Sequence, residues 1–267
     1  MPDDEKRNEE TNKNNLRWGV FIPSFLVVGG ATLLGIVNNK GLASLTENLF
    51  GGILNNLGWL FQIMSLATLF LILYLFISKH GSIRLGGEDA EPQFSFVKWF
   101  AMALTGGIST GIVVWGANEP LIYFGNVYGE ISQLGLEAGE PMTAIFALAR
   151  CFYNWTFIPY AMYSLSGLAI AYVYFNRKEP LMVSSSLVPL IGDRAKKGII
   201  SNIVDTLSLL ALALGLSATL GAGLALVGTG LEVSYGISQG PVVWFSIAAI
   251  IIATYSISSI LGLKRGI

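Results

Sequence analysis

Apolar residues along this chain of 267 residues fall into long blocks and do not alternate with polar ones. A helix that crosses the hydrocarbon core of a bilayer needs about 20 apolar residues, and six blocks approach or exceed that length. The blocks are Trp18–Asn38, Leu54–Ser78, Trp99–Trp115, Met142–Phe175, Ile203–Val227 and Val242–Leu263. The pattern predicts an all-α integral membrane protein with about six transmembrane helices. The fourth block exceeds one span, so we expect it to be tilted or to protrude from the membrane.

Composition supports a membrane protein and excludes several functions. Hydrophobic residues make up 53% of the chain and charged residues 12%, unlike a soluble domain. A net charge of −1 leaves no basic face for nucleic acid. Cys151 and His80 are the single cysteine and histidine of the sequence, which leaves little material for a disulfide, a histidine-based metal site or a catalytic triad. We therefore expect neither an enzyme nor a resident metal.

Basic residues are concentrated in alternate connections between the blocks. They are Lys6, Arg7, Lys13 and Arg17 before the first block, Lys79 and Arg84 after the second, Arg177, Lys178, Arg194, Lys196 and Lys197 after the fourth, and Lys264 and Arg265 after the sixth. The opposite connections carry Lys40 and several acids. The positive-inside rule then predicts a multi-pass protein of the cell membrane with both termini cytoplasmic.

The first fifteen residues are polar and charged without apolar periodicity, which predicts a disordered cytoplasmic tail. A cleavable signal peptide is the alternative interpretation. Against it, the apolar block after Arg17 is too long, and Asn38, Asn39 and Lys40 follow where a cleavage site needs small residues.

The string Gly107-Ile108-Ser109-Thr110-Gly111 allows three interpretations. It matches the G-x-S-x-G nucleophile elbow, but that hydrolase fold places its histidine after the serine, and His80 precedes it. The same glycines form G-x-x-x-G, a helix-packing motif. The interpretation that we favour adds Gly106, because glycines crowded in one membrane segment predict an unwound stretch that lines a cavity.

Glu119 stands before Pro120 near the end of the third block. Ionisable groups within membrane segments are functional candidates, so Glu119 could relay protons. We favour a position at the outer interface, wetted by solvent, because Pro120 is expected to end the span.

Three aromatic residues, Trp155, Tyr160 and Tyr163, lie in the middle of the fourth block. Tyr160 and Tyr163 are helical neighbours, whereas Trp155 lies about 140° from Tyr160 on an ideal helix unless Pro159 kinks it. Aromatic rings in a dry cavity attract a quaternary ammonium group. An interfacial aromatic belt is the alternative, and composition alone favours it.

The sequence resembles the betaine/carnitine/choline transporter family in five ordered blocks from about Trp18 onward. They are Gly81-Ser82-Ile83-Arg84-Leu85-Gly86, Glu91-Pro92-Gln93-Phe94-Ser95, the glycine-rich segment ending Trp115-Gly116-Ala117-Asn118-Glu119-Pro120, the segment from Trp155 to Tyr163, and the segment from Ser184 to Gly192.

The resemblance implies a twelve-helix transporter with two inverted five-helix repeats, of which this chain is the N-terminal half. Residues 1–17 would be a cytoplasmic tail, 18–78 two peripheral helices, 79–98 a cytoplasmic linker, and 99–267 the first four helices of one repeat, with the second repeat absent.

The resemblance also assigns site residues. Trp155, Tyr160 and Tyr163 match the family's aromatic box for trimethylammonium groups, with tyrosine at Tyr160 where tryptophan is typical, and Ile108 is assigned to the same substrate site. Sodium, the candidate coupling ion, would meet the backbone carbonyls of Thr105 and Ile108. Ser109 replaces a glycine that is typical of sodium-coupled members, and Asn154 replaces a histidine.

The implied function is secondary active transport of quaternary-ammonium compounds such as glycine betaine, carnitine or choline. The alternative is a truncated or split half without transport activity of its own. The expected partners are a small zwitterionic or cationic substrate and the lipid bilayer. Coupling, substrate and oligomeric state stay open, and a homo-oligomer is one alternative.

Overall fold

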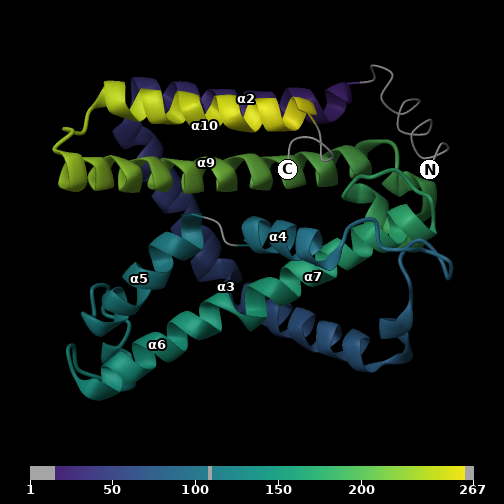
Figure 1. Ribbon diagram of the computed structural model, residues 1–267, viewed down its shortest axis with the longest axis horizontal. Coiled ribbons are helices and arrows are strands. Elements are labelled where there is room, and N and C mark those ends of the chain that lie inside the picture. The colour runs from purple at the N-terminus through teal and green to yellow at the C-terminus, as the bar shows by residue number, and fades with distance from the viewer. Residues whose placement is uncertain (1–15, 108–109, 262–267) are drawn as a thin grey trace. The chain divides into compact units, whose positions relative to one another are not determined.

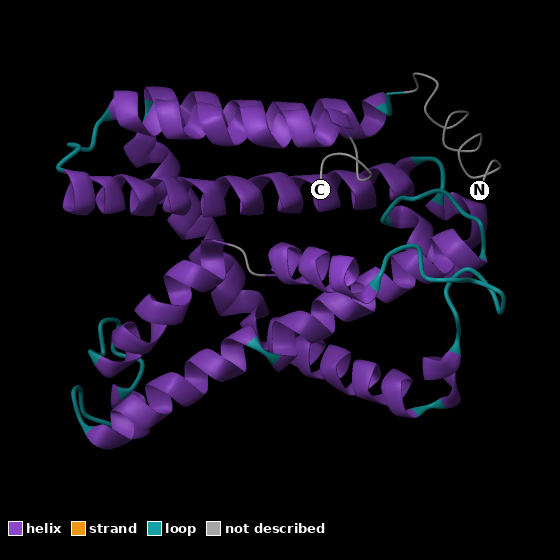
Figure 2. Ribbon diagram, viewed as in Figure 1, coloured by secondary structure: helices purple, strands orange, loops and turns teal. Residues whose placement is uncertain are grey.

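The computed structural model describes residues 16–107 and 110–261. All regular elements in this part are helical (Figures 1 and 2). The α-helices are α2 (Trp18–Val37), α3 (Asn39–Ile77), α4 (Phe96–Gly107), α5 (Thr110–Phe124), α6 (Pro141–Trp155), α7 (Phe157–Ala171), α8 (Val188–Ile191), α9 (Ile199–Tyr235) and α10 (Pro241–Leu261). The expected disordered tail at residues 1–15 lies outside the described residues.

Five helical segments of the described residues are long and apolar enough to cross a membrane. They are Trp18–Val37, Asn39–Ile77, Pro141–Asn176, Ile199–Tyr235 and Pro241–Leu261. Five of the six predicted blocks fall within or nearly within these segments. The remaining block, Trp99–Trp115, includes residues 108–109, which lie outside the described residues, and the helices on either side of them, α4 with 12 residues and α5 with 15, are each too short to span alone. The described residues thus contain five candidate spans, and the sixth stays a prediction.

Asn38 alone separates α2 from α3. Its backbone N–H donates to the carbonyl of Leu34 and closes α2, while its side-chain Oδ1 accepts from the N–H of Gly41 at 2.9 Å and caps α3. Helix α3 thus begins well before the predicted block at Leu54. At 39 residues it is about 58 Å long, roughly twice the hydrocarbon thickness of a bilayer.

The fourth predicted block is one helical segment interrupted at Thr156. Helix α6 ends at Trp155, Thr156 has φ −113° and ψ −92°, and α7 begins at Phe157. Pro159 explains the break, because its nitrogen cannot donate to the carbonyl of Trp155 and its ring would collide with that carbonyl in a continuous helix. The break separates the helix that carries Trp155 from the helix that carries Tyr160.

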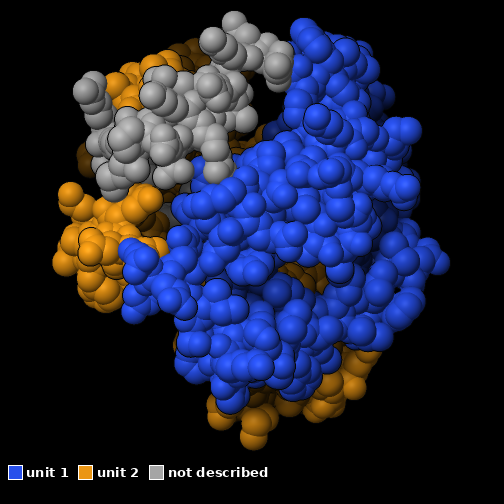
Figure 3. Space-filling view, turned by 90° about the vertical axis from the view of Figure 1, so that its right-hand side faces the viewer, with its two compact units in different colours: residues 1–89, 163–214 blue, residues 90–162, 215–267 orange. Residues whose placement is uncertain are grey.

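The chain divides into two compact units, blue and orange in Figure 3. The first comprises residues 1–89 and 163–214, and the second comprises residues 90–162 and 215–267. Buried residues of the first include Val173, Val188 and Ala195, and those of the second include Ile131 and Ala147. Few residues of the candidate spans are buried within the protein. Their exposed apolar surface suits contact with lipid or with further helices.

Candidate functional site

Glu119 lies on α5 in the second unit and is half-buried. Helix α5 does not stop at Pro120 but continues to Phe124, with the proline inside it. The expectation that the helix stops at Pro120 is therefore wrong, and Glu119 is half-buried instead of fully wetted, while its position at the outer membrane interface stays a prediction. A helix in a membrane tolerates an internal proline where neighbouring groups satisfy the freed carbonyl.

Both carboxylate oxygens of Glu119 accept hydrogen bonds from the last turn of α6. The side-chain amide of Asn154 donates to Oε1 at 2.5 Å, and the indole N–H of Trp155 donates to Oε2 at 2.5 Å. The same amide approaches the hydroxyl of Tyr123 at 3.4 Å. Helices α5 and α6 pack against each other, and Tyr123 meets Phe146 edge to face at 6.0 Å between ring centroids. A carboxylate from one helix thereby fixes two consecutive side chains of the other.

The three predicted box residues are distributed over the broken helical segment. Trp155 is the last residue of α6 and is half-buried, while Tyr160 and Tyr163 lie on α7 with exposed fractions of 44% and 75%. Trp155 and Tyr160 belong to the second unit and Tyr163 to the first. An aromatic box formed by all three stays a prediction, and the aromatic belt stays its alternative.

The predicted unwound hinge lies largely outside the described residues. Helix α4 ends at Gly107 and α5 begins at Thr110, while residues 108–109 and the side chains of residues 104–111 are not described. The assignments to this segment stay predictions. They are Thr105, Gly106, Gly107, Ile108, Ser109 and Gly111.

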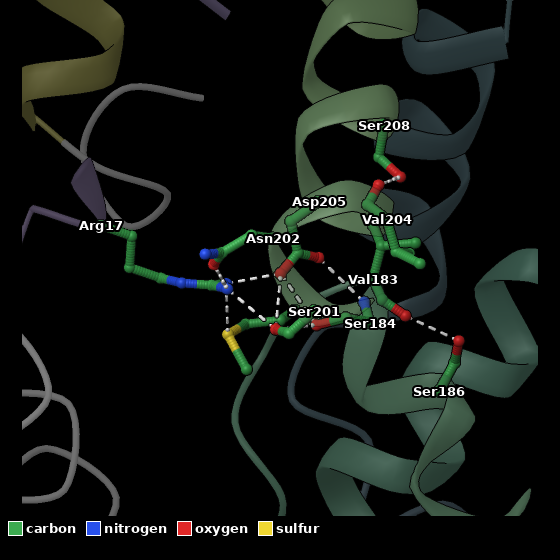
Figure 4. A network of polar contacts seen from close by, with 10 residues as sticks. Arg17, Val183, Ser184, Ser186, Ser201, Asn202, Val204, Asp205 and Ser208 are labelled. Carbon is green, nitrogen blue, oxygen red and sulfur yellow. Dashed lines mark hydrogen bonds and ion pairs between the residues drawn. The ribbon is translucent and has the colours of Figure 1, made fainter. Parts of the chain in front are cut away.

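A second polar cluster occurs in the first unit around Asp205 near the start of α9 (Figure 4). Its Oδ2 accepts from Arg17 Nη1 at 2.5 Å and from the Ser184 hydroxyl at 2.8 Å, and its Oδ1 accepts from the Ser184 backbone N–H at 2.9 Å. The other guanidinium nitrogen of Arg17 donates to Ser201 at 2.8 Å and Asn202 at 3.0 Å. Ser184 and Ser201 are fully buried. We call these five residues the Asp205 cluster.

The Asp205 cluster ties together three distant segments: the residue before α2, the 3-10 turn Ser184–Leu187, and the first turns of α9. Sequence reasoning missed this cluster. Asp205 is an acid within a predicted membrane block, which is a signal for a paired or functional group. Its partner Arg17 lies 188 positions away, and no local pattern identifies a pair so distant.

No group of three or more His, Cys, Asp and Glu side chains suited to a metal ion occurs in the described part of the chain.

Long apolar helices, an exposed apolar surface and polar clusters between helices define an all-helical, multi-pass membrane protein. The profile of the family described as "BCCT, betaine/carnitine/choline family transporter" matches residues 19–267. The chain belongs to this family.

Several curated relatives are similar to nearly the whole chain. The probable glycine betaine transporter of Desulfitobacterium hafniense is 29% identical over 93% of this chain and 45% of its own length. The ectoine/hydroxyectoine transporter of Virgibacillus pantothenticus is 30% identical over 96% of this chain and 50% of its own. Glycine betaine transporter 1 of Vibrio parahaemolyticus is 32% identical over 95% of this chain and 49% of its own length. The chain thus spans about half the length of the curated relatives that it matches.

Proposed function

We propose that this chain is the N-terminal half of a secondary active transporter for quaternary-ammonium compounds, with glycine betaine as the first candidate substrate. The observation that carries the proposal is the family match over residues 19–267, together with relatives named as betaine and ectoine transporters. Carnitine and choline are further candidates, because they carry the same trimethylammonium group.

Trp155 is the central binding residue in this proposal, with Tyr160, Tyr163 and Ile108 as the other members of the substrate site. The anchoring of the Trp155 indole by Glu119 supports it, because a fixed ring loses little conformational freedom when a ligand binds. A trimethylammonium group over an aromatic face gains about 2 kcal/mol when the site is dry.

Transport by alternating access needs two repeats that rock around a shared site. We therefore propose that residues 1–267 do not transport by themselves, in agreement with their match to about half of each relative. Translating the nucleotide sequence beyond the codon for Ile267 tests whether this chain is one half of a longer transporter. A continuing frame with further apolar blocks supports the proposal, and a stop codon favours a split or truncated half.

Sodium is the coupling ion that we propose, held by the backbone carbonyls of Thr105 and Ile108. The test is uptake of radiolabelled glycine betaine by the full-length protein in liposomes, with an inward gradient of sodium or of potassium. Uptake that requires sodium supports transport and coupling together. Uptake that is equal in both gradients rejects sodium coupling, and uptake no greater than in empty liposomes rejects the substrate.

A further inference from the structure

The contact between Glu119 and Trp155 joins an acid to the indole that the proposed function places against the substrate. Glu119 comes from the middle of α5, and Trp155 is the last residue of α6 before the break at Thr156. Pro159 cannot donate to the carbonyl of Trp155, so Trp155 stands at the end of the regular helix and not within it. The Glu119 side chain restrains the indole of Trp155 through the hydrogen bond to its N–H.

Both oxygens of the Glu119 carboxylate accept hydrogen bonds. Its two oxygens accept separately from Asn154 and Trp155 at 2.5 Å each. An ionised carboxylate is purely an acceptor, so two N–H donors suit the charged form of Glu119 and need no proton on it. A hydrogen bond from a neutral N–H to an anion is shorter and stronger than one between neutral groups. Asn154 restrains the carboxylate in turn, so Glu119 cannot easily turn away from the indole.

A negative charge at the indole N–H also changes the ring electronically. Hydrogen bonds to charged groups polarise the donor, and withdrawal of the proton toward the carboxylate moves electron density into the indole ring. The face of an aromatic ring attracts cations through its negative quadrupole. A ring that is richer in electrons binds a quaternary ammonium group more tightly.

We propose that Glu119 is a positioning residue for the substrate site: it holds the Trp155 ring in place and strengthens the attraction of that ring for a cationic headgroup. Glu119 acts through the indole N–H and does not itself bind the ammonium group. The inference rests on the proposed function, because its effect on substrate is measured as uptake of glycine betaine. The contact between Glu119 and Trp155 can be tested even if the protein carries no glycine betaine.

The experiment compares Glu119→Gln with Glu232→Gln in the full-length protein. Glu232 is the matched control, because it belongs to the second unit and accepts a hydrogen bond from Gln239 at 2.8 Å far along the chain from Trp155. Glutamine has nearly the size of glutamate, but it removes the charge and presents an amide donor to one of the two N–H groups. The NMR resonance of the Trp155 indole N–H, assigned by its loss in Trp155→Phe, reports the contact in each variant.

We expect Glu119→Gln to move this resonance and to raise the KM for glycine betaine by about fivefold to tenfold with little change in kcat, since a hydrogen bond to a charged group is lost. Glu232→Gln should leave the Trp155 indole resonance and the KM for glycine betaine unchanged. In a Trp155→Phe background, which has no indole N–H, Glu119→Gln should change KM less than about twofold, because the two residues then no longer interact.

An unmoved resonance in Glu119→Gln overturns the inference. So does a change of KM that is equal in the wild-type and Trp155→Phe backgrounds, because Glu119 would then act independently of the indole. If the wild-type protein takes up no glycine betaine, the proposed function fails, and the indole resonance alone decides whether Glu119 holds Trp155.

Discussion

The carboxylate of Asp205 gathers polar groups from segments that are far apart in the sequence. It meets a guanidinium, a backbone N–H and a hydroxyl, two of them contributed by the fully buried Ser184. Asp205 side-chain exposure is 11% and that of Arg17 is 35%, so solvent screens the pair only in part. Removing the charge would leave the donors of Arg17 and Ser184 poorly satisfied.

We expect Asp205→Asn to lower the free energy of unfolding by about 2 kcal/mol, the scale of a lost hydrogen bond to a charged group. The matched control is Asp89→Asn, which should change stability by less than about 0.5 kcal/mol, because the Asp89 side chain is exposed and makes no ion pair within the described residues. Thermal unfolding in detergent checks both. Equal melting temperatures for the two variants would show that the Asp205 cluster contributes nothing to stability.

Lys196 lies in the connection between α7 and α9 and binds two acids, Asp193 at 2.7 Å and Glu179 at 2.9 Å. The hydrogen bond to Asp193, followed by that to Glu179, raises the pKa of Lys196 above its ordinary 10.5. The hydrogen bond from Lys196 lowers the pKa of Asp193 below its ordinary 3.8. The stabilisation by Lys196 is complete below 10.5 and is lost as pH rises through the raised value. The stabilisation by Asp193 is complete above 3.8 and is lost as pH falls through the lowered value.

Lys196→Met should therefore reduce stability by a constant amount between about pH 5 and pH 9, and the difference from wild type should shrink toward both extremes. Melting temperatures from about pH 3 to about pH 11 check the profile. Lys197→Met is the control, because the neighbouring Lys197 makes no ion pair within the described part of the chain. A difference that stays the same from about pH 3 to about pH 11 would contradict the ion-pair explanation.

At the scale of helices, Asn38 ends α2 and starts α3 with a single residue between two membrane segments. Its side chain caps the first turn of α3 by accepting from Gly41. Such a short connection leaves no other side chain in a position to replace it.

Asn38→Ala should lower stability by about 1 kcal/mol, the usual effect of losing an N-cap. Asn39→Ala removes the same side chain from the first helical position, where it caps nothing, and should be nearly neutral or slightly stabilising. Hydrogen exchange at the backbone amides of the first turn of α3 distinguishes the two variants, and we expect faster exchange only in Asn38→Ala. Unchanged protection in Asn38→Ala would show that the cap is dispensable.

Local pattern predicted most helices of this protein, because a bilayer requires long apolar segments and few other structures produce them. It did not predict that α3 begins at Asn39, since the polar residues up to Asn56 conceal a helix that extends beyond the hydrocarbon core. Trp155 was predicted from sequence as a binding residue, which stays a prediction, but its contact with Glu119 was not predicted, because Glu119 and Trp155 are 36 positions apart. Contacts between distant segments depend on packing that periodicity does not record.

At the scale of the whole molecule, the distribution of basic residues predicts that the connection after α5 and the connection after α7 face opposite sides of the membrane. We expect a cysteine at Glu137 to react with an impermeant reagent added outside intact cells, and a cysteine at Lys197 to react only after the membrane is opened. Cys151→Ser removes the single native thiol of residues 1–267 from the background. The reverse labelling pattern would invert the proposed topology.

The central claim is that the aromatic face of Trp155 binds a quaternary-ammonium substrate. Its most direct test is equilibrium binding of glycine betaine to the full-length protein and to its Trp155→Leu variant, which keeps an apolar side chain but lacks the ring. We expect the variant to bind about tenfold more weakly, the factor that corresponds to about 1.4 kcal/mol. A neutral isostere with carbon in place of the charged nitrogen should bind wild type and variant alike. Equal affinity of both proteins for glycine betaine would contradict the claim and leave Trp155 as part of an interfacial aromatic belt.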